Sequence, residues 1–168
     1  VVGCNTNLGI ILLCVPIVEA IYLDKELKFK QNNLKKIIDS IDVKQTKSIY
    51  KAINIAKAGG MGSKDKFDLN NSKALDFTFK EAMNFASSYD YIASEYNTNF
   101  NNIINKISIN WRNYFKFMNN AECATTATFL KLISSNPDSL IARKHDIDKA
   151  KEVSLKFKPL AEEYCSLK

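Results

Sequence analysis

Apolar residues recur at helical spacing through most of this 168-residue chain, and strand-like alternation is almost absent. The clearest run extends from Tyr89 to Met118, where apolar side chains follow one another at steps of three and four residues. Such steps place side chains on one face of a helix. The sequence therefore predicts one long amphipathic helix across residues 89–118 and an all-α fold, a multi-helix bundle.

Caps and terminators indicate further helices. Asp42 is placed to cap a helix that Gly59 and Gly60 would end, since Asp is favoured at helix starts and Gly at helix ends. Residues 76–87 are expected to form a short helix. Residues 121–134 are apolar nearly all round, which predicts a central helix.

The chain after the central helix has the signals of a break and a restart. Asn136 and Pro137 end the helical pattern, and Asp138 is placed to cap the next turn. A last helix begins near Ile147, with Pro159 as an expected kink. The stretch from Asp24 to Lys36 is expected to be a charged connection or an exposed helix.

Composition narrows the class of protein. The net charge of +6 comes mostly from lysines spread along the chain, whereas nucleic-acid binders concentrate basic residues on one face. We therefore expect an anionic small molecule rather than a nucleic acid as the partner. The apolar run at residues 8–18 is shorter than the roughly twenty residues that cross a bilayer, so it predicts a buried helix and no membrane partner.

Cysteine and histidine usage points away from structural zinc. The four cysteines, at positions 4, 14, 123 and 165, show no C-x-x-C spacing, and His145 is the one histidine. No secretory leader or disulfide-like spacing is evident, so reduced thiols and a cytoplasmic location are expected. An oligomer is compatible with the sequence.

Polar residues interrupt the apolar pattern at the start of the first helix, in Asn5-Thr6-Asn7-Leu8-Gly9. These side chains could cap the helix, since Asn and Thr accept hydrogen bonds from free backbone N–H groups there. The same N–H groups can bind a phosphate, so capping and ligand binding are compatible. A loop containing Gly59, Gly60 and Gly62 lacks a Walker ending, and is read either as a helix terminator or as a loop that approaches phosphate.

A second polar cluster, Pro137 to His145, contains Asp138, Ser139, Arg143 and Lys144. Ser139 and Arg143 are four residues apart, which puts them on one face of a helix. Arg binds phosphate with two-point geometry, and Asp can hold Mg²⁺ or act as a base, although a surface ion pair is the ordinary alternative.

Acidic candidates also occur on the predicted long helix. Asp90 and Glu95 are followed by the segment from Tyr96 to Phe100, and a polar stripe runs along the same helix. A charged face of this kind is usually solvated, and a polar cleft is the alternative.

These motifs together resemble the triphosphoribosyl-dephospho-CoA synthase family, most closely its archaeal branch. The resemblance rests on Asn5 to Leu13, the glycines at 59, 60 and 62, Asp90 with Glu95-Tyr96-x-Thr98-x-Phe100, and Pro137 to Lys144, which occur in the family's order. It covers most of the chain and is loosest around residues 24–40 and 63–75.

The resemblance implies an all-helical transferase that moves the triphosphoribosyl group of ATP to the 2′-hydroxyl of dephospho-CoA and releases adenine. The product would be the prosthetic-group precursor of citrate lyase and malonate decarboxylase. Such a transfer needs a base near the hydroxyl, stabilisation of positive charge at the ribose carbon, and cations on the triphosphate.

Matched motif positions imply the site residues. Asp138 and Asp90 are expected to be catalytic and to hold Mg²⁺, while Arg143 and Lys144 bind the triphosphate. The other expected substrate-binding residues are Asn5, Thr6, Gly9, Gly59, Gly60, Gly62, Tyr96, Thr98 and Ser139. The cluster at the first helix and the cluster at Asp138 are expected to converge around a polyphosphate.

The chain also departs from the family pattern. A Lys-Pro-Gly motif and an Asn-Pro-Gly-Thr-Thr-Ala-Asp segment are missing, Val1 is not an initiator Met, and Lys57-Ala58 stands where relatives have Asn-Pro. We therefore expect residues 1–168 to be a single helical domain that lacks terminal parts of its parent. Two alternatives stay open: a related nucleotide or phosphoribosyl transferase with another substrate, and a non-catalytic helical nucleotide-binding module.

Overall fold

The structure, a computed structural model, describes residues 7–56, 67 and 76–166. Nine α-helices and one π-helix make up this described part, and it contains no strand, so the all-α prediction is confirmed. The chain divides into two compact units, residues 1–100 and 101–168, which are described separately below. The single-domain expectation stays a prediction.

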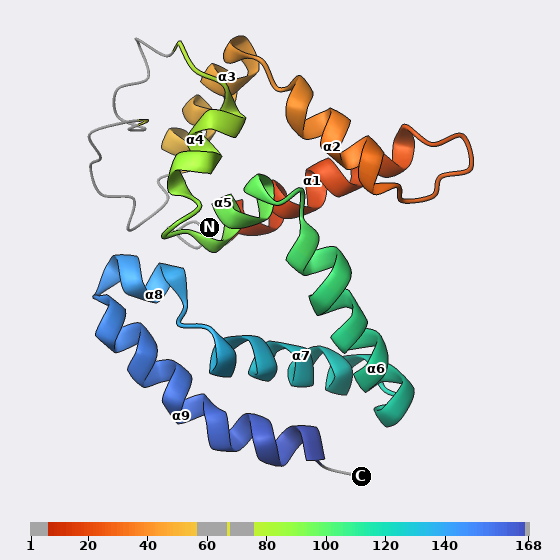
Figure 1. Cartoon of the computed structure of the whole chain (residues 1–168), viewed down its shortest axis with the longest axis vertical. Coiled ribbons are helices and arrows are strands. Elements are labelled where there is room, and N and C mark those ends of the chain that lie inside the picture. Colours follow the sequence, from red (N-terminus) through yellow and green to blue (C-terminus); the bar gives the residue numbers. More distant parts are fainter. Residues whose placement is uncertain (1–6, 57–66, 68–75, 167–168) are drawn as a thin grey trace. The chain divides into compact units, whose positions relative to one another are not determined.

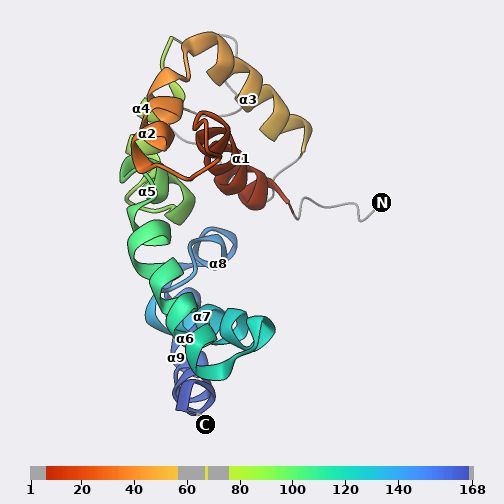
Figure 2. The same cartoon turned by 90° about the vertical axis from the view of Figure 1, so that its right-hand side faces the viewer.

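Unit 1 is built from helices that pack pairwise. Helix α1 contacts α2 and α5, and α4 contacts α3 and α5 (Figure 1 and Figure 2). The helices are α1 (Leu8–Tyr22), α2 (Gln31–Ser40), α3 (Val43–Ile55), α4 (Phe79–Ala86) and α5 (Tyr91–Asn97).

Local sequence sets two of these helix starts. The predicted cap of α3 is confirmed: the Asp42 carboxylate accepts a hydrogen bond from the Gln45 backbone N–H at 2.7 Å, and the Gln45 side chain accepts one in return at 2.9 Å. Thr78 and Glu81 form the same reciprocal arrangement before α4. The short helix expected at residues 76–87 therefore starts at Phe79, because Thr78 supplies the cap.

Aromatic rings fill the middle of unit 1. Phe79, Tyr96 and Phe100 are nearly inaccessible to solvent, and the rings of Phe79 and Phe100 lie 5.2 and 5.1 Å from that of Tyr96, both edge to face. Edge-to-face contacts add to the hydrophobic stabilisation that burial provides. These rings fix α5 against its neighbours.

Helix α1 is present as expected, but its predicted burial is wrong for most of its length. Only Pro16 and Ala20 are buried, whereas Ile10, Ile11 and Val15 are 61%, 55% and 47% exposed. The buried positions form a narrow stripe, because only one side of α1 meets α2 and α5. An apolar run alone does not tell how many neighbours a helix has.

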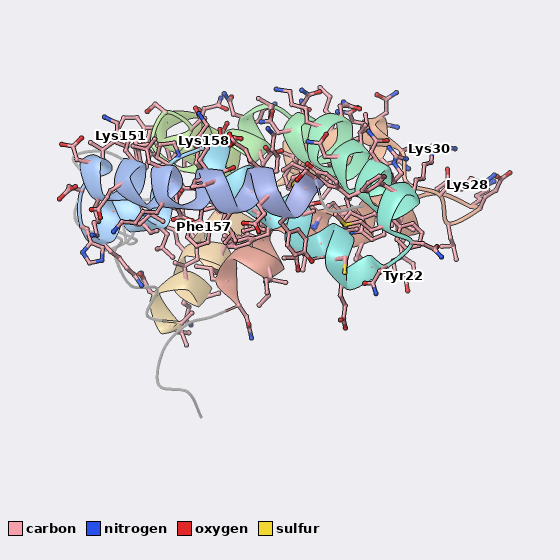
Figure 3. The ribbon with its side chains drawn as sticks, turned by 90° about the horizontal axis from the view of Figure 1, so that it is seen from below. Tyr22, Lys28, Lys30, Lys151, Phe157 and Lys158 are labelled. Atoms are coloured by element: carbon pink, nitrogen blue, oxygen red, sulfur yellow. The ribbon has the colours of Figure 1, made fainter. Side chains whose placement is uncertain are left out.

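The charged connection expected after Asp24 is a loop followed by α2. Asp24 organises this loop: its carboxylate is buried, accepts hydrogen bonds from the backbone N–H groups of Glu26 and Lys28, and pairs with Lys30. Lys28 and Lys30 extend from the loop in Figure 3. The hydrogen bond to the Lys30 ammonium, helped by the two backbone bonds, lowers the pKa of Asp24 below its ordinary value.

Unit 2 is a helical hairpin with additions. Helix α7 packs between α6 and α9, and α9 also contacts α8 (Figure 1). The elements are the π-helix η2 (Ile103–Ile107), α6 (Ser108–Met118), α7 (Ala121–Ser135), α8 (Ser139–Lys144) and α9 (Ile147–Ser166).

Small residues are buried in both α7 and α9, which contact each other. They are Ala124 and Ala127 in α7 and Ala150 and Ala161 in α9, and such small side chains permit a close approach of two helices. The expected central position of α7 agrees with its place between α6 and α9. Phe129 of α7 contacts Phe157 of α9 edge to face, with ring centroids 6.5 Å apart, and is nevertheless 54% exposed. Along α9, Lys151 and Lys158 lie on one edge and Phe157 on the other (Figure 3).

The single helix predicted across residues 89–118 is wrong. The chain leaves α5 through Asn99 and Phe100, whose φ values of 50° and 60° are incompatible with a right-handed helix. Burial of the Phe100 ring in unit 1 accompanies this turn, and the Phe100 N–H donates to the Glu95 carbonyl at 2.7 Å. Helical spacing persists on both sides of the break, which is why the sequence suggested continuity.

Candidate functional site

The cluster around Asp138 is a short helix with a strong cap. The Asp138 Oδ1 atom accepts hydrogen bonds from the Leu140 and Ile141 backbone N–H groups at 2.7 and 2.9 Å, which confirms the predicted cap. Helix α7 ends before it at Ser135 with Asn136 as its C-cap, and Pro137 cannot donate a backbone hydrogen bond. The break and the new cap together fix where α8 begins.

Helix α8 arranges the predicted phosphate-binding residues. Ser139 opens the helix, and Arg143 lies one turn later on the same face, as the spacing predicted. Arg143 is half-buried and Lys144 is exposed, both in the last turn. Cations in a last turn also complement the helix dipole, so their position is compatible with a structural role as well as with anion binding.

Asp90 of unit 1 caps a helix in the same way as Asp138 of unit 2. It precedes α5, and its Oδ1 atom accepts a hydrogen bond from the Ala93 backbone N–H at 3.0 Å. Its side chain is half-buried. Both predicted catalytic acids are therefore helix N-caps, and each presents its carboxylate where backbone N–H groups already favour negative charge.

The structure brings part of the first motif beside α5. An added methyl group on Gly9 would lie 3.1 Å from Ile92 Cδ1, so the first turn of α1 and the first turn of α5 approach closely. Asn7 precedes α1 but its side chain makes no capping hydrogen bond, unlike Asp90. Asn5 and Thr6 lie outside the described residues, as do Gly59, Gly60 and Gly62.

Tyr96 and Thr98 have partners within unit 1. The Tyr96 hydroxyl donates to the Leu12 carbonyl at 2.6 Å, and the Thr98 hydroxyl donates to the Ser94 carbonyl at 3.0 Å. Tyr96 is 2% exposed, whereas Thr98 is exposed. Their assignment to substrate binding stays a prediction.

The bond from Tyr96 to Leu12 was missed at the sequence level. A signal was present, because Pro16 stands in the middle of a helical run and must leave one carbonyl without its usual helical donor. Nothing in the local sequence says which side chain would replace that donor. The partners are 84 residues apart.

A shallow hollow of about 340 Å³ occurs in unit 2. Its walls are almost wholly apolar and come from η2, α6 and α7. The lining residues are Ile103, Ile107, Ser108, Trp111, Arg112 and Thr128. None of the residues predicted from the motifs lines it.

At any one place, the described residues offer at most two side chains of the kinds that commonly bind metal ions. They contain no group of three or more His, Cys, Asp or Glu side chains placed to hold a metal ion. Mg²⁺ commonly uses one or two carboxylates and completes its coordination with water and substrate phosphates. Asp138 fits this sparse pattern, since its cap uses Oδ1 and leaves Oδ2 out of the capping bonds.

The predicted residues thus fall into one set in each unit. Gly9, Asp90 and Tyr96 belong to the packed pair α1 and α5, and Asp138 to Lys144 form α8. Convergence of the two sets stays a prediction from the sequence. No helix among the described residues combines the length and apolar character that a membrane span requires.

Comparison with known proteins gives a family. The model of CitG, ATP:dephospho-CoA triphosphoribosyl transferase, matches residues 1–166, and comparisons with curated proteins and with solved structures found no match. The matched range includes α1, α5 and α8, whose motifs carried the resemblance, and that resemblance is confirmed. The chain therefore belongs to the CitG family, enzymes that transfer the triphosphoribosyl group of ATP to dephospho-CoA.

Proposed function

We propose that α8 is the triphosphate-binding element of this transferase. The observation that carries the proposal is the fixed turn itself, in which the Asp138 cap and the helix set Ser139 and Arg143 on one face. Arg143 supplies two-point hydrogen bonding to phosphate oxygens, and Lys144 adds a second cation in the same turn. The family's ATP substrate carries the charge that these residues match.

Asp138 is proposed to contribute in a second way. Its Oδ2 atom is the expected ligand for a Mg²⁺ ion that accompanies ATP, with Asp90 as a further candidate ligand. Bound there, the ion would neutralise charge on the triphosphate. The cap through Oδ1 would hold the carboxylate in one orientation, which favours a defined ligand geometry.

The reaction itself sets what else the protein must provide. The bond between adenine and ribose carbon C1′ breaks, and a new bond forms between C1′ and the 2′-oxygen of dephospho-CoA. The hydroxyl proton leaves to a base, and adenine departs with the bonding electrons and takes up a proton. We propose as that base whichever of the two carboxylates, Asp90 or Asp138, does not bind the Mg²⁺ ion, since both are half-buried acids in family motifs.

The residues of the first motif are proposed to shape the nucleotide pocket. Gly9 lets the first turn of α1 approach α5, which puts the start of α1 near the helix that Asp90 caps. Backbone N–H groups at a helix start favour anions. We propose that Asn5, Thr6 and the glycines at 59, 60 and 62 also shape the nucleotide pocket. A cytoplasmic location is proposed as well.

Adenine release tests the reaction directly. The protein is incubated with ATP and Mg²⁺, with and without dephospho-CoA, and free adenine and the coupled product are measured by chromatography and mass spectrometry. We expect adenine in amounts equal to the new triphosphoribosyl conjugate, and only when dephospho-CoA is present. ATP binding without turnover would instead indicate a nucleotide-binding module, and turnover with a different acceptor would indicate a changed substrate.

A further inference from the structure

Helix α1 lacks one backbone hydrogen bond in its middle, and a side chain from another helix replaces the missing donor. Pro16 lies inside α1 and has no backbone N–H, so it cannot donate to the carbonyl four residues earlier, that of Leu12. Pro16 is buried, and Leu12 is half-buried. A carbonyl without a partner in such surroundings costs free energy.

Tyr96 supplies the missing donor. Its hydroxyl lies 2.6 Å from the Leu12 carbonyl oxygen, and its side chain is 2% exposed. Burial, with a contribution from the charge of Glu19, raises the pKa of this hydroxyl above its ordinary value. The group therefore stays protonated, and remains a donor, across the pH range in which the protein would work.

A second contact fixes the same pair of helices. Gly9 leaves room for Ile92, which would lie 3.1 Å from an added methyl group at position 9. On α1, Gly9 is three residues before Leu12; on α5, Ile92 is four residues before Tyr96. Gly9 packs against Ile92, and the Leu12 carbonyl accepts the hydrogen bond from Tyr96. The two contacts are about one turn apart on each helix, so together they oppose sliding of α1 along α5.

We propose that Tyr96 is a positioning residue that replaces the hydrogen-bond donor lost at Pro16 and so holds the first turn of α1 beside Asp90. The hydroxyl acts on the site through α1 and does not touch substrate. Its link to catalysis rests on the proposed function, because the first turn of α1 follows the Asn5 to Asn7 motif. The link to helix register rests on the contacts alone.

A double-mutant cycle at Tyr96 and Pro16 distinguishes this role from direct substrate binding. Tyr96→Phe removes the donor, and Pro16→Ala restores an N–H at position 16 that can reach the Leu12 carbonyl within the helix. The variants Y96F, P16A and Y96F/P16A are compared with the starting protein by thermal unfolding, by amide exchange in α1 and by steady-state kinetics. Tyr22→Phe is the control, since Tyr22 is on the same helix and is 74% exposed.

The expected result is rescue. Y96F should raise the ratio of unfolded to folded protein at equilibrium by about 10-fold or more, and it should speed amide exchange in the first turn of α1. It should also lower kcat by about tenfold or more with a smaller change in KM, because displacement of a site element affects the reacting geometry. The double variant should recover most of each loss, and Y22F should behave as the starting protein.

Other outcomes would overturn the proposal. If Tyr96→Phe causes the same loss with and without the Pro16→Ala substitution, the hydroxyl acts independently of the Leu12 carbonyl, as a substrate contact would. No loss in unfolding, exchange or kinetics would show that the bond does not hold α1. If Y96F fails to fold, a folded double variant supports the proposal and an unfolded one contradicts it.

Failure of the proposed function would look different. The starting protein would then show no adenine release, whereas the unfolding and exchange measurements would still decide whether Tyr96 replaces the donor lost at Pro16. A starting protein that is active, together with a double variant that recovers stability but not kcat, would refute the catalytic link alone.

Discussion

The two units of this protein hold their helices together by different means. In unit 1, side chains of one helix donate to backbone carbonyls of another: Tyr96 to Leu12 at 2.6 Å and Asn33 to Ala20 at 3.2 Å. In unit 2, buried alanines let α7 and α9 approach closely. The stability of unit 1 should therefore be sensitive to truncation of buried side chains, and that of unit 2 to enlargement of its buried alanines.

The largest effect is expected from emptying the aromatic centre of unit 1. Phe79→Ala removes a ring that is 1% exposed and packs edge to face on Tyr96. Removal should lower the free energy of unfolding by about 3–5 kcal/mol. Chemical denaturation measures it, with Phe117→Ala as the control, since Phe117 is 57% exposed and should cost much less. Equal losses would contradict the aromatic core.

The next effect tests unit 2 by addition. Ala127→Leu inserts three carbon atoms at a fully buried position of α7 whose backbone carbonyl oxygen is 3.9 Å from the Cys165 thiol of α9. Overpacking should lower the free energy of unfolding by about 1–3 kcal/mol. Lys131→Leu, one turn later at an exposed position, is the matched control and should have little effect. A stabilising Ala127→Leu would mean that the two helices have room between them.

A smaller effect concerns the carboxylate that organises the loop after α1. Hydrogen bonds from Lys30 and from two backbone N–H groups lower the pKa of Asp24, so its stabilising contribution is present above the ordinary carboxyl pKa and is lost as pH falls through the lowered value. The melting temperature of Asp24→Asn should therefore fall less between pH 5 and pH 2 than that of the starting protein. Parallel curves for the two proteins would contradict this role.

The smallest effect is expected at the surface of unit 2. Hydrogen bonds with Lys156 and Lys149 lower the pKa of Glu152 to about 2, yet the Glu152 side chain is 45% exposed, against 6% for that of Asp24. Its contribution is likewise lost as pH falls toward that value, but salt should screen it. Any loss on Glu152→Gln should disappear in about 1 M salt, whereas the Asp24→Asn difference should persist.

Local signals explain which parts of the fold could be predicted. The caps at Asp42 and Asp138 were readable because a cap depends on a few adjacent residues. The turn at Asn99 and Phe100 could not be predicted, because it accompanies the complete burial of Phe100 in unit 1, which depends on packing between elements. Similarly, the exposure of α1 depends on how many helices surround it, which its own sequence does not state.

The candidate site divides in the same way. The face shared by Ser139 and Arg143 followed from spacing within one helix. The approach of Gly9 to Ile92 and the bond from Tyr96 to Leu12 join segments more than eighty residues apart, so periodicity could not supply them. Asn5, Thr6 and the glycines at 59, 60 and 62 lie outside the described residues.

The central claim, that α8 binds the triphosphate of ATP, is tested most directly by nucleotide affinity at Arg143. Isothermal titration of ATP and of adenosine compares the starting protein with Arg143→Ala, Arg143→Lys and the exposed control Lys131→Ala. We predict that R143A weakens ATP binding by roughly 10- to 100-fold, that R143K recovers part of this, and that adenosine affinity and K131A are unchanged. An R143A variant that folds and binds ATP as tightly as the starting protein would contradict the account.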